Sequence, residues 1–216
     1  MTERSIDSLW ELMLAERVAL AEDLAGLTRE QWCHFTLCGE WDVEQVVAHL
    51  TAAASLGQWQ WIRSMIGAGF RPHLHNQRRL EEQLGDTPTE TLNRFRAVID
   101  SRIAPTSDIA AFLGEVVVHA QDIRQPLGLT REPRVEALTP VAAFFASRNF
   151  AVNSRTLVRG LRLKSDDGPF TEGAGSLVTG STLALVMAMA GRSAYLDALD
   201  GPGVPVLRSR ISTRPS

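Results

Sequence analysis

Residues 112–122 read Phe-Leu-Gly-Glu-Val-Val-Val-His-Ala-Gln-Asp, and this segment decides the fold. Apolar residues occupy almost every side of the helix it would form, which is typical of a helix buried inside a bundle. Glu115 and His119 break the pattern, and they are four positions apart. In a helix they lie on one face, about 6 Å apart along the axis. The segment therefore predicts a central helix with a polar pair on one face.

Segments on either side have the periodicity of amphipathic helices. Gly26 ends the first of them, and Asp42 with Gln45 three residues later has the pattern of a capping box at the start of the second. The helices are expected at about residues 6–24, 42–66, 88–99, 107–124 and 140–153. Four main helices joined by loops favour a mainly α protein built on a four-helix bundle.

The pattern changes after Asn153. Apolar residues recur with a period of two in residues 157–163, which is typical of a strand. A turn is expected at residues 166–169, a return strand at 176–179, helices at 181–190 and 192–199, and a last strand at about 204–207. These elements predict a small C-terminal α+β domain at residues 154–216, attached to a helical bundle at residues 1–153.

Composition excludes several classes of function. The chain has 216 residues and a formal net charge of −3, with no basic stripe, so neither nucleic acid nor a membrane surface is an expected partner. The longest apolar stretch, residues 183–190, is too short to span a bilayer, and the N-terminus lacks the apolar core of a signal peptide. The two cysteines, Cys33 and Cys38, do not make a disulfide framework. We expect a cytoplasmic monomer or homodimer that acts on small molecules.

The polar pair on the central helix indicates metal chemistry. A buried carboxylate such as that of Glu115 costs several kcal/mol unless it is paired or bound to a cation. His49 has a similar apolar helical setting, within residues 46–50, and it becomes a third ligand if the two helices face each other. Two imidazoles and one carboxylate suit zinc, nickel or iron(II), and three protein ligands leave positions open for catalysis. An ion pair for Glu115 and His119, and a hydrogen-bonded core role for His49, are the alternatives.

Other polar residues have simpler explanations. His73 and His75 lie in a segment expected to be a solvated loop. Cys38 is expected to pack in the core instead of acting as a redox thiol. Asp122 is expected to form a structural salt bridge, with Arg124 or another arginine, in preference to holding a metal ligand in place.

Residues 40–50, Glu-Trp-Asp-Val-Glu-Gln-Val-Val-Ala-His-Leu, preceded by Cys38, resemble the first signature of the mycothiol-dependent maleylpyruvate isomerase family, which belongs to the wider DinB-like metal-binding bundles. Residues 115–122 resemble its second signature. The tail is similar too, in residues 160–163, in the turn at 168–169 and in residues 190–192.

This resemblance implies a DinB-like bundle in which His49, Glu115 and His119 bind one divalent metal, with zinc expected. It also implies that Arg192 is a catalytic and cofactor-binding residue that helps to bind substrate or thiol. The position of Gln121 is often aromatic in relatives, so the pocket wall is expected to differ there.

The implied chemistry uses a borrowed thiol. Coordination to a metal removes the proton of a thiol, and neither signature offers a convincing nucleophile of its own. We therefore expect an enzyme that activates mycothiol, either as an isomerase that adds the thiolate to a cis alkene and eliminates it again, or as a transferase whose product is the adduct. One alternative is a metal-dependent hydrolase that uses bound water. Another is a non-catalytic DinB-like metal-binding stress module.

Overall fold

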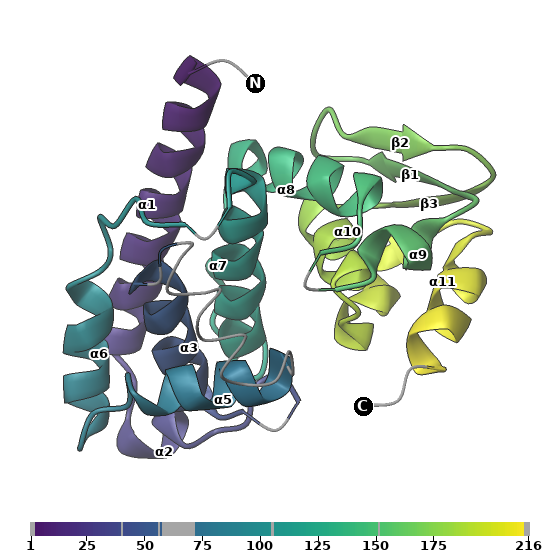
Figure 1. Cartoon of the computed structure of the whole chain (residues 1–216). Coiled ribbons are helices and arrows are strands. Elements are labelled where there is room, and N and C mark those ends of the chain that lie inside the picture. The colour runs from purple at the N-terminus through teal and green to yellow at the C-terminus, as the bar shows by residue number, and fades with distance from the viewer. Residues whose placement is uncertain are drawn as a thin grey trace. The chain divides into compact units, whose positions relative to one another are not determined.

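The structure of the chain is a computed structural model that describes residues 3–39, 41–55, 57, 72–104, 106–150 and 152–213. It is mainly helical, with a small four-stranded sheet near the C-terminus, as the sequence predicts (Figure 1). Contacts divide the chain into two compact units, Met1–Arg131 and Glu132–Ser216. None of the described helices is long and apolar enough to cross a membrane.

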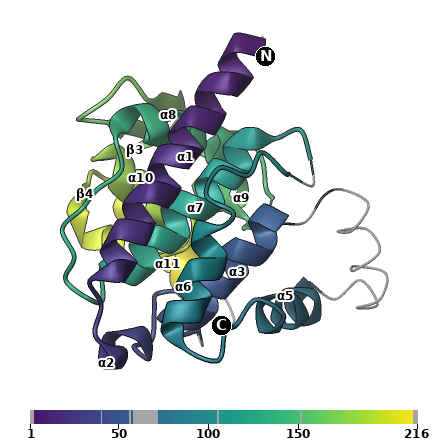
Figure 2. The same cartoon turned by 90° about the vertical axis from the view of Figure 1, so that its left-hand side faces the viewer.

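The first unit is a bundle of helices. Its helices are α1 (Glu3–Ala25), α2 (Arg29–Trp32), α3 (Val43–Ser55), α5 (Pro72–Glu81), α6 (Pro88–Arg96) and α7 (Ile109–Arg124). Helix α7 packs along α1 and against α3, and α6 packs against both α1 and α3, as Figure 2 shows from a second side. Helix α5 lies against α3. The four helices α1, α3, α6 and α7 thus form the predicted bundle.

The two central helices follow the sequence pattern closely. Leu113, Val117 and Ala120 of α7 are fully buried, which confirms a helix with apolar surroundings. At the start of α3, Asp42 Oδ1 accepts from the backbone N–H of Gln45 at 2.9 Å, and Gln45 Oε1 accepts from that of Asp42 at 3.1 Å. This reciprocal pair is the predicted capping box, which satisfies two N–H groups that the helix itself cannot.

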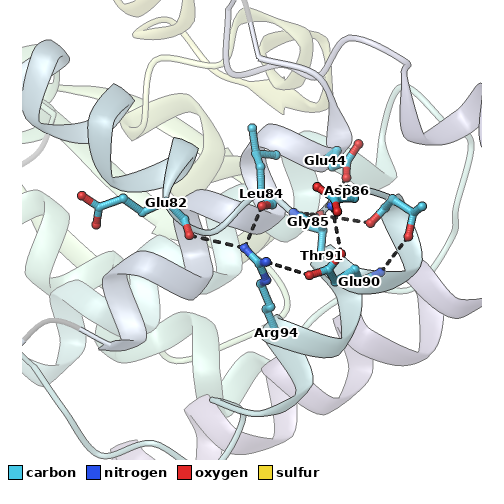
Figure 3. Close-up of polar contacts among 9 residues, drawn as sticks. Glu44, Glu82, Leu84, Gly85, Asp86, Glu90, Thr91 and Arg94 are labelled. Atoms are coloured by element: carbon cyan, nitrogen blue, oxygen red, sulfur yellow. Dashed lines mark hydrogen bonds and ion pairs between the residues drawn. The ribbon is translucent and has the colours of Figure 1, made fainter.

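A buried hydroxyl anchors the turn between α5 and α6 (Figure 3). Thr91 Oγ1 accepts from the backbone N–H of Gly85 at 2.8 Å and donates to Glu44 of α3 at 2.7 Å. Arg94 donates to the carbonyl oxygen of Leu84 at 2.7 Å. A methyl group at Gly85 would lie 2.6 Å from Cβ of Glu90, so this position needs glycine. The network ties the turn to the N-terminal end of α3.

Of two further predictions for the first unit, one was wrong and the other lies mostly outside the described residues. The segment that holds His73 and His75 is helical, within α5, and the prediction of a loop there was wrong. Leu80 is fully buried and gives this otherwise polar helix an anchor. The second predicted helix is described as α3 to Ser55, and its expected continuation to residue 66 lies mostly outside the described residues.

The second unit combines helices with a mixed sheet. Its elements are α8 (Val135–Ser147), α9 (Ser154–Val158), β1 (Leu161–Ser165), β2 (Thr171–Gly173), β3 (Ser176–Gly180), α10 (Thr182–Met189), the 3₁₀ helix η1 (Ser193–Ala198), β4 (Leu199–Asp200) and α11 (Val204–Ser212). The strand order is β2-β1-β3-β4. Side chains of β1 alternate between buried and exposed, because one face of the sheet is covered. Helix α10 is buried along its length and contacts β1 and β3.

The pairing of the strands differs from a simple hairpin. Strand β3 pairs in parallel with β1, and the short strand β2, which the sequence analysis missed, supplies the antiparallel neighbour. A parallel pair cannot be joined by a tight turn, so the chain reaches β3 through β2. The predicted strand at residues 176–179 is therefore present, but it is not the return strand of a hairpin.

Two further predictions for the second unit were wrong. Leu157 belongs to helix α9, and the strand begins only at Leu161. Residues 204–207 start helix α11 instead of a strand, because Pro205 suits the first turn of a helix and Leu207 and Ile211, four apart, bury one face.

Helix α8 begins at Val135, so Pro140 lies inside it and not at its start. The compact units divide after Arg131, which groups α8 with the second unit. The predicted boundary after residue 153, between the helical bundle and the C-terminal α+β domain, stays a prediction.

Candidate metal centre

The facing helices α3 and α7 bring together the three residues that the sequence proposes as ligands. Nε2 of His49 lies 3.4 Å from Oε2 of Glu115, and Nε2 of His119 lies 3.4 Å from the same oxygen. The two imidazole rings meet edge to face, with centroids 5.1 Å apart. Within the described part of the chain, these three residues form a group of donor atoms that all lie within 4.8 Å of one another.

The spacing of these donors suits a metal ion. An N–H···O hydrogen bond is best at about 2.7–3.2 Å, so a separation of 3.4 Å is long for one. Two ligands of a tetrahedral zinc ion, each about 2.0–2.2 Å from the metal, lie roughly 3.3–3.5 Å apart. Both histidine–carboxylate separations have this length, and both nitrogens approach the same carboxylate oxygen. The residues present therefore fit a divalent ion.

Burial and charge act against each other at this centre. Burial opposes ionisation of Glu115, but hydrogen bonds and charge from His119 and His49 outweigh it, and the carboxyl pKa lies well below its ordinary value. Burial also opposes protonation of His119. Hydrogen bonds with Asp122, Cys38 and Glu115 reverse that effect and raise the pKa of His119 well above its ordinary value. In the metal-free protein, Glu115 is thus the anion that attracts a cation.

The three side chains are partly accessible. The exposed fractions are 12% for His49, 22% for Glu115 and 10% for His119. Glu115 is therefore the most accessible of the three side chains, while the two imidazoles are mostly enclosed. Such partial enclosure strengthens electrostatic interactions and still permits a ligand to enter.

The loop before α3 forms one wall of the centre. The backbone N–H of Leu37 donates to the carbonyl oxygen of Asp122 at 3.1 Å, which ties the loop to α7. Within the loop, the backbone N–H and the hydroxyl of Thr36 both donate to the carbonyl oxygen of Trp41. The ring of Trp41 lies against that of His49, with centroids 5.0 Å apart. The loop thus restricts the orientation of one expected ligand.

A second group of donors surrounds the other edge of His119. Nδ1 of His119 lies 3.0 Å from Oδ2 of Asp122, and the thiol of Cys38 lies within 4.8 Å of a ring nitrogen of His119. One atom from each of these three residues lies within 4.8 Å of the others. The sequence predicts a salt bridge between Asp122 and Arg124 or another arginine. Arg124 instead pairs with Asp23, with Nη2 2.8 Å from Oδ2, and Asp122 contacts His119.

The sequence carries a signal for only one of these neighbours. Asp122 follows His119 by three positions, which places both on one face of α7. Cys38 is far away in sequence, and only the loop folding onto α7 brings its thiol to the ring. The expectation that Cys38 is a packed cysteine stays a prediction, and it did not place the thiol near a proposed ligand.

Arg192 and Gln121 occupy well-defined positions. Arg192 lies in the second unit, between α10 and η1, where Gly191 takes a positive φ of 87° and Arg192 Nη1 donates to the carbonyl oxygen of Ala190. Its expected role in binding thiol or substrate stays a prediction. Gln121 is buried and donates to the carbonyl oxygen of Arg131 at 3.2 Å.

The chain is thus a helical bundle in which two histidines and one glutamate on facing helices form a candidate metal centre. Residues 13–105 match the family model described as the mycothiol maleylpyruvate isomerase N-terminal domain, and this confirms the predicted resemblance over that segment. The matched segment includes His49 and ends before α7.

Solved structures extend the likeness to most of the chain. The crystal structure of the mycothiol-dependent maleylpyruvate isomerase is 15% identical, with a TM-score of 0.62, and that of a histidine-to-alanine mutant of the enzyme is 14% identical, with a TM-score of 0.63. In both comparisons, 91% of this chain and 92% of the other chain are covered. At this identity the likeness shows a shared fold. No curated protein matches the sequence significantly.

Proposed function

We propose that this protein is a metal-dependent enzyme that activates a low-molecular-weight thiol, mycothiol, for transfer to a small electrophile or for cis–trans isomerisation of one. The observation that carries the proposal is the approach of His49 and His119 to the same oxygen of Glu115, each at 3.4 Å. The matched N-terminal domain and the shared fold support mycothiol as the thiol. A cytoplasmic location agrees with a thiol cosubstrate that must stay reduced.

The ligand set favours an anionic partner. Glu115 contributes one negative charge and the two imidazoles bind as neutral groups, so a divalent ion held there would keep a net charge of about +1. Such an ion lowers the pKa of a coordinated thiol enough for the thiolate to predominate at neutral pH. Three protein ligands leave a position for that sulfur, and zinc is the expected metal.

The surrounding residues define how the thiol and the electrophile would be handled. Glu115 has the largest exposed fraction of the three side chains, so we expect the thiol to approach from its side. In isomerisation, the sulfur forms a bond to one alkene carbon, the C–C bond rotates, and elimination restores the alkene and the thiolate. In transfer, a proton completes the adduct. Arg192 is the proposed contact for an anionic group of the thiol or the substrate.

Cobalt substitution provides the test. A sulfur ligand adds a near-ultraviolet charge-transfer band to the spectrum of bound cobalt, so mycothiol should produce the band. S-methyl mycothiol, which has no proton to lose, should not. Product formation from an electrophile should then require mycothiol. Turnover without any thiol would support the hydrolase, and a spectrum unchanged by thiols would contradict the proposal.

A further inference from the structure

The contact between His119 and Asp122 determines which ring nitrogen of His119 carries a proton. A carboxylate is an acceptor only, so the 3.0 Å contact between His119 Nδ1 and Asp122 Oδ2 requires a proton on Nδ1. In a neutral imidazole, the other nitrogen then carries the free lone pair. That nitrogen, Nε2, is the one that points at Glu115.

Asp122 is well placed to fix this arrangement. Its side chain is fully buried, and the backbone carbonyl of the same residue accepts from the loop at Leu37, so both ends of Asp122 are held. His119 and Asp122 share one face of α7 at a spacing of three, which keeps their separation constant as long as the helix is intact. The ring of His119 therefore has little freedom to rotate or to change tautomer.

We propose that Asp122 is the positioning residue of the metal centre: it accepts Nδ1–H of His119 and so presents Nε2 to the ion shared with Glu115 and His49. This inference rests on the proposed function, because it needs an ion at that position. Histidine ligands of metals commonly donate their second ring N–H to a carboxylate, and removal of such a partner weakens metal binding by about 10- to 100-fold.

Cys38 defines the rival explanation. Its thiol, a ring nitrogen of His119 and a carboxylate oxygen of Asp122 all lie within 4.8 Å of one another, a spacing that could hold a metal. If these three residues bound an ion of their own, Asp122 would be a ligand and His119 could not keep its proton on Nδ1. The two explanations therefore differ in the number of bound ions, in sulfur ligation and in the protonated nitrogen of His119.

Cobalt titration of the full-length protein distinguishes them. We expect one bound cobalt ion in the wild type, with no sulfur charge-transfer band before thiol is added. Asp122→Asn should bind one ion about 10- to 100-fold more weakly. The matched control is Asp23→Asn, which removes the carboxylate that pairs with Arg124 in the same unit and should leave cobalt affinity within about threefold. Cys38→Ser should likewise bind one ion.

A second measurement does not depend on any variant. Nitrogen-15 NMR of the zinc-loaded wild type should show His119 with a slowly exchanging proton on Nδ1 and with Nε2 bound to metal. Coordination through Nδ1, two bound ions with a sulfur band, or wild-type affinity in Asp122→Asn would each overturn the inference about Asp122. A wild type that binds no cobalt would instead contradict the proposed function, so the two failures are distinguishable.

Discussion

Glu115 is the residue on which the candidate metal centre depends. Its position four residues before His119 on an apolar helix was visible in the sequence, and the structure brings Nε2 of both histidines to its carboxylate. The sequence could nominate His49 only on the condition that two helices face each other, and the packing of α3 against α7 meets that condition. The spacing of three in the sequence indicates the contact of Asp122 with His119. The approach of Cys38 to His119 needed the fold, because it depends on how the loop packs on α7.

The first prediction concerns the histidine ligands. His49→Ala and His119→Ala should each weaken zinc binding by more than about a hundredfold, since loss of a partner that only orients a ligand already costs about 10- to 100-fold. Equilibrium dialysis with zinc measures this directly. His34→Ala is the matched control, because His34 is exposed and its ring contacts the carbonyl oxygen of Phe35. Full zinc binding by both variants would contradict the assignment of His49 and His119 as metal ligands.

At the scale of elements, the sequence was most informative where local chemistry decides the outcome. The capping box at Asp42 and the end of α1 before Gly26 both appeared as expected. Errors arose where long-range contacts override a local pattern. Residues 204–207 have an apolar content that suits a strand, yet burial of Leu207 and Ile211 on one side selects a helix.

The second prediction tests the anchor of the α5–α6 turn. Thr91→Val keeps the shape of the side chain but leaves the backbone N–H of Gly85 without its acceptor, so unfolding should become easier by about 1–3 kcal/mol. Thr89→Val, on the exposed side of the same helix, should change the free energy of unfolding by less than about 0.5 kcal/mol. Denaturant unfolding measures both. Equal stability of the two variants would show that the network in Figure 3 contributes little.

The third prediction concerns the start of α10 in acid. Burial opposes ionisation of Asp167, but hydrogen bonds from Ser165 and Thr182 outweigh it and hold the pKa of this carboxyl below its ordinary value. A depressed folded-state pKa stabilises the fold at a pH above the unfolded value, near 3.9, and the contribution disappears as the pH falls through the folded-state pKa.

Thermal unfolding at pH values from 7 down to 2 provides the measurement. Asp167→Asn should lower stability at neutral pH and should lose less stability than the wild type on acidification below about pH 4. Asp166→Asn, at the exposed neighbouring residue, should follow the wild-type curve. If all three proteins had parallel curves, the hydrogen bonds to Asp167 would not matter for folding.

At the scale of the whole molecule, composition and periodicity predicted a mainly helical protein with a small mixed unit at the C-terminus, and the structure agrees. Strand order was beyond the sequence, because the parallel pairing of β1 with β3 depends on the short strand β2. The division after Arg131 also depends on contacts of α8 with α9 and α10 that no local pattern reveals.

The fourth prediction links the second unit to the proposed chemistry. Arg192→Ala should leave zinc affinity unchanged and raise KM for the thiol or the electrophile by about ten- to a hundredfold, since a hydrogen bond to a charged group contributes about 1.5–3 kcal/mol. Arg208→Ala, which removes an exposed arginine paired with Asp197, is the control. Unchanged kinetics in Arg192→Ala would return this residue to a structural role.

X-ray absorption at the zinc edge tests the central claim most directly. The zinc-loaded protein should show only nitrogen and oxygen ligands, at about 2.0–2.2 Å, with the multiple-scattering signature of two imidazoles. After mycothiol is added, one sulfur should appear at about 2.3 Å. A sulfur ligand before any thiol is added, a shell without imidazole, or no sulfur at saturating mycothiol would contradict the account.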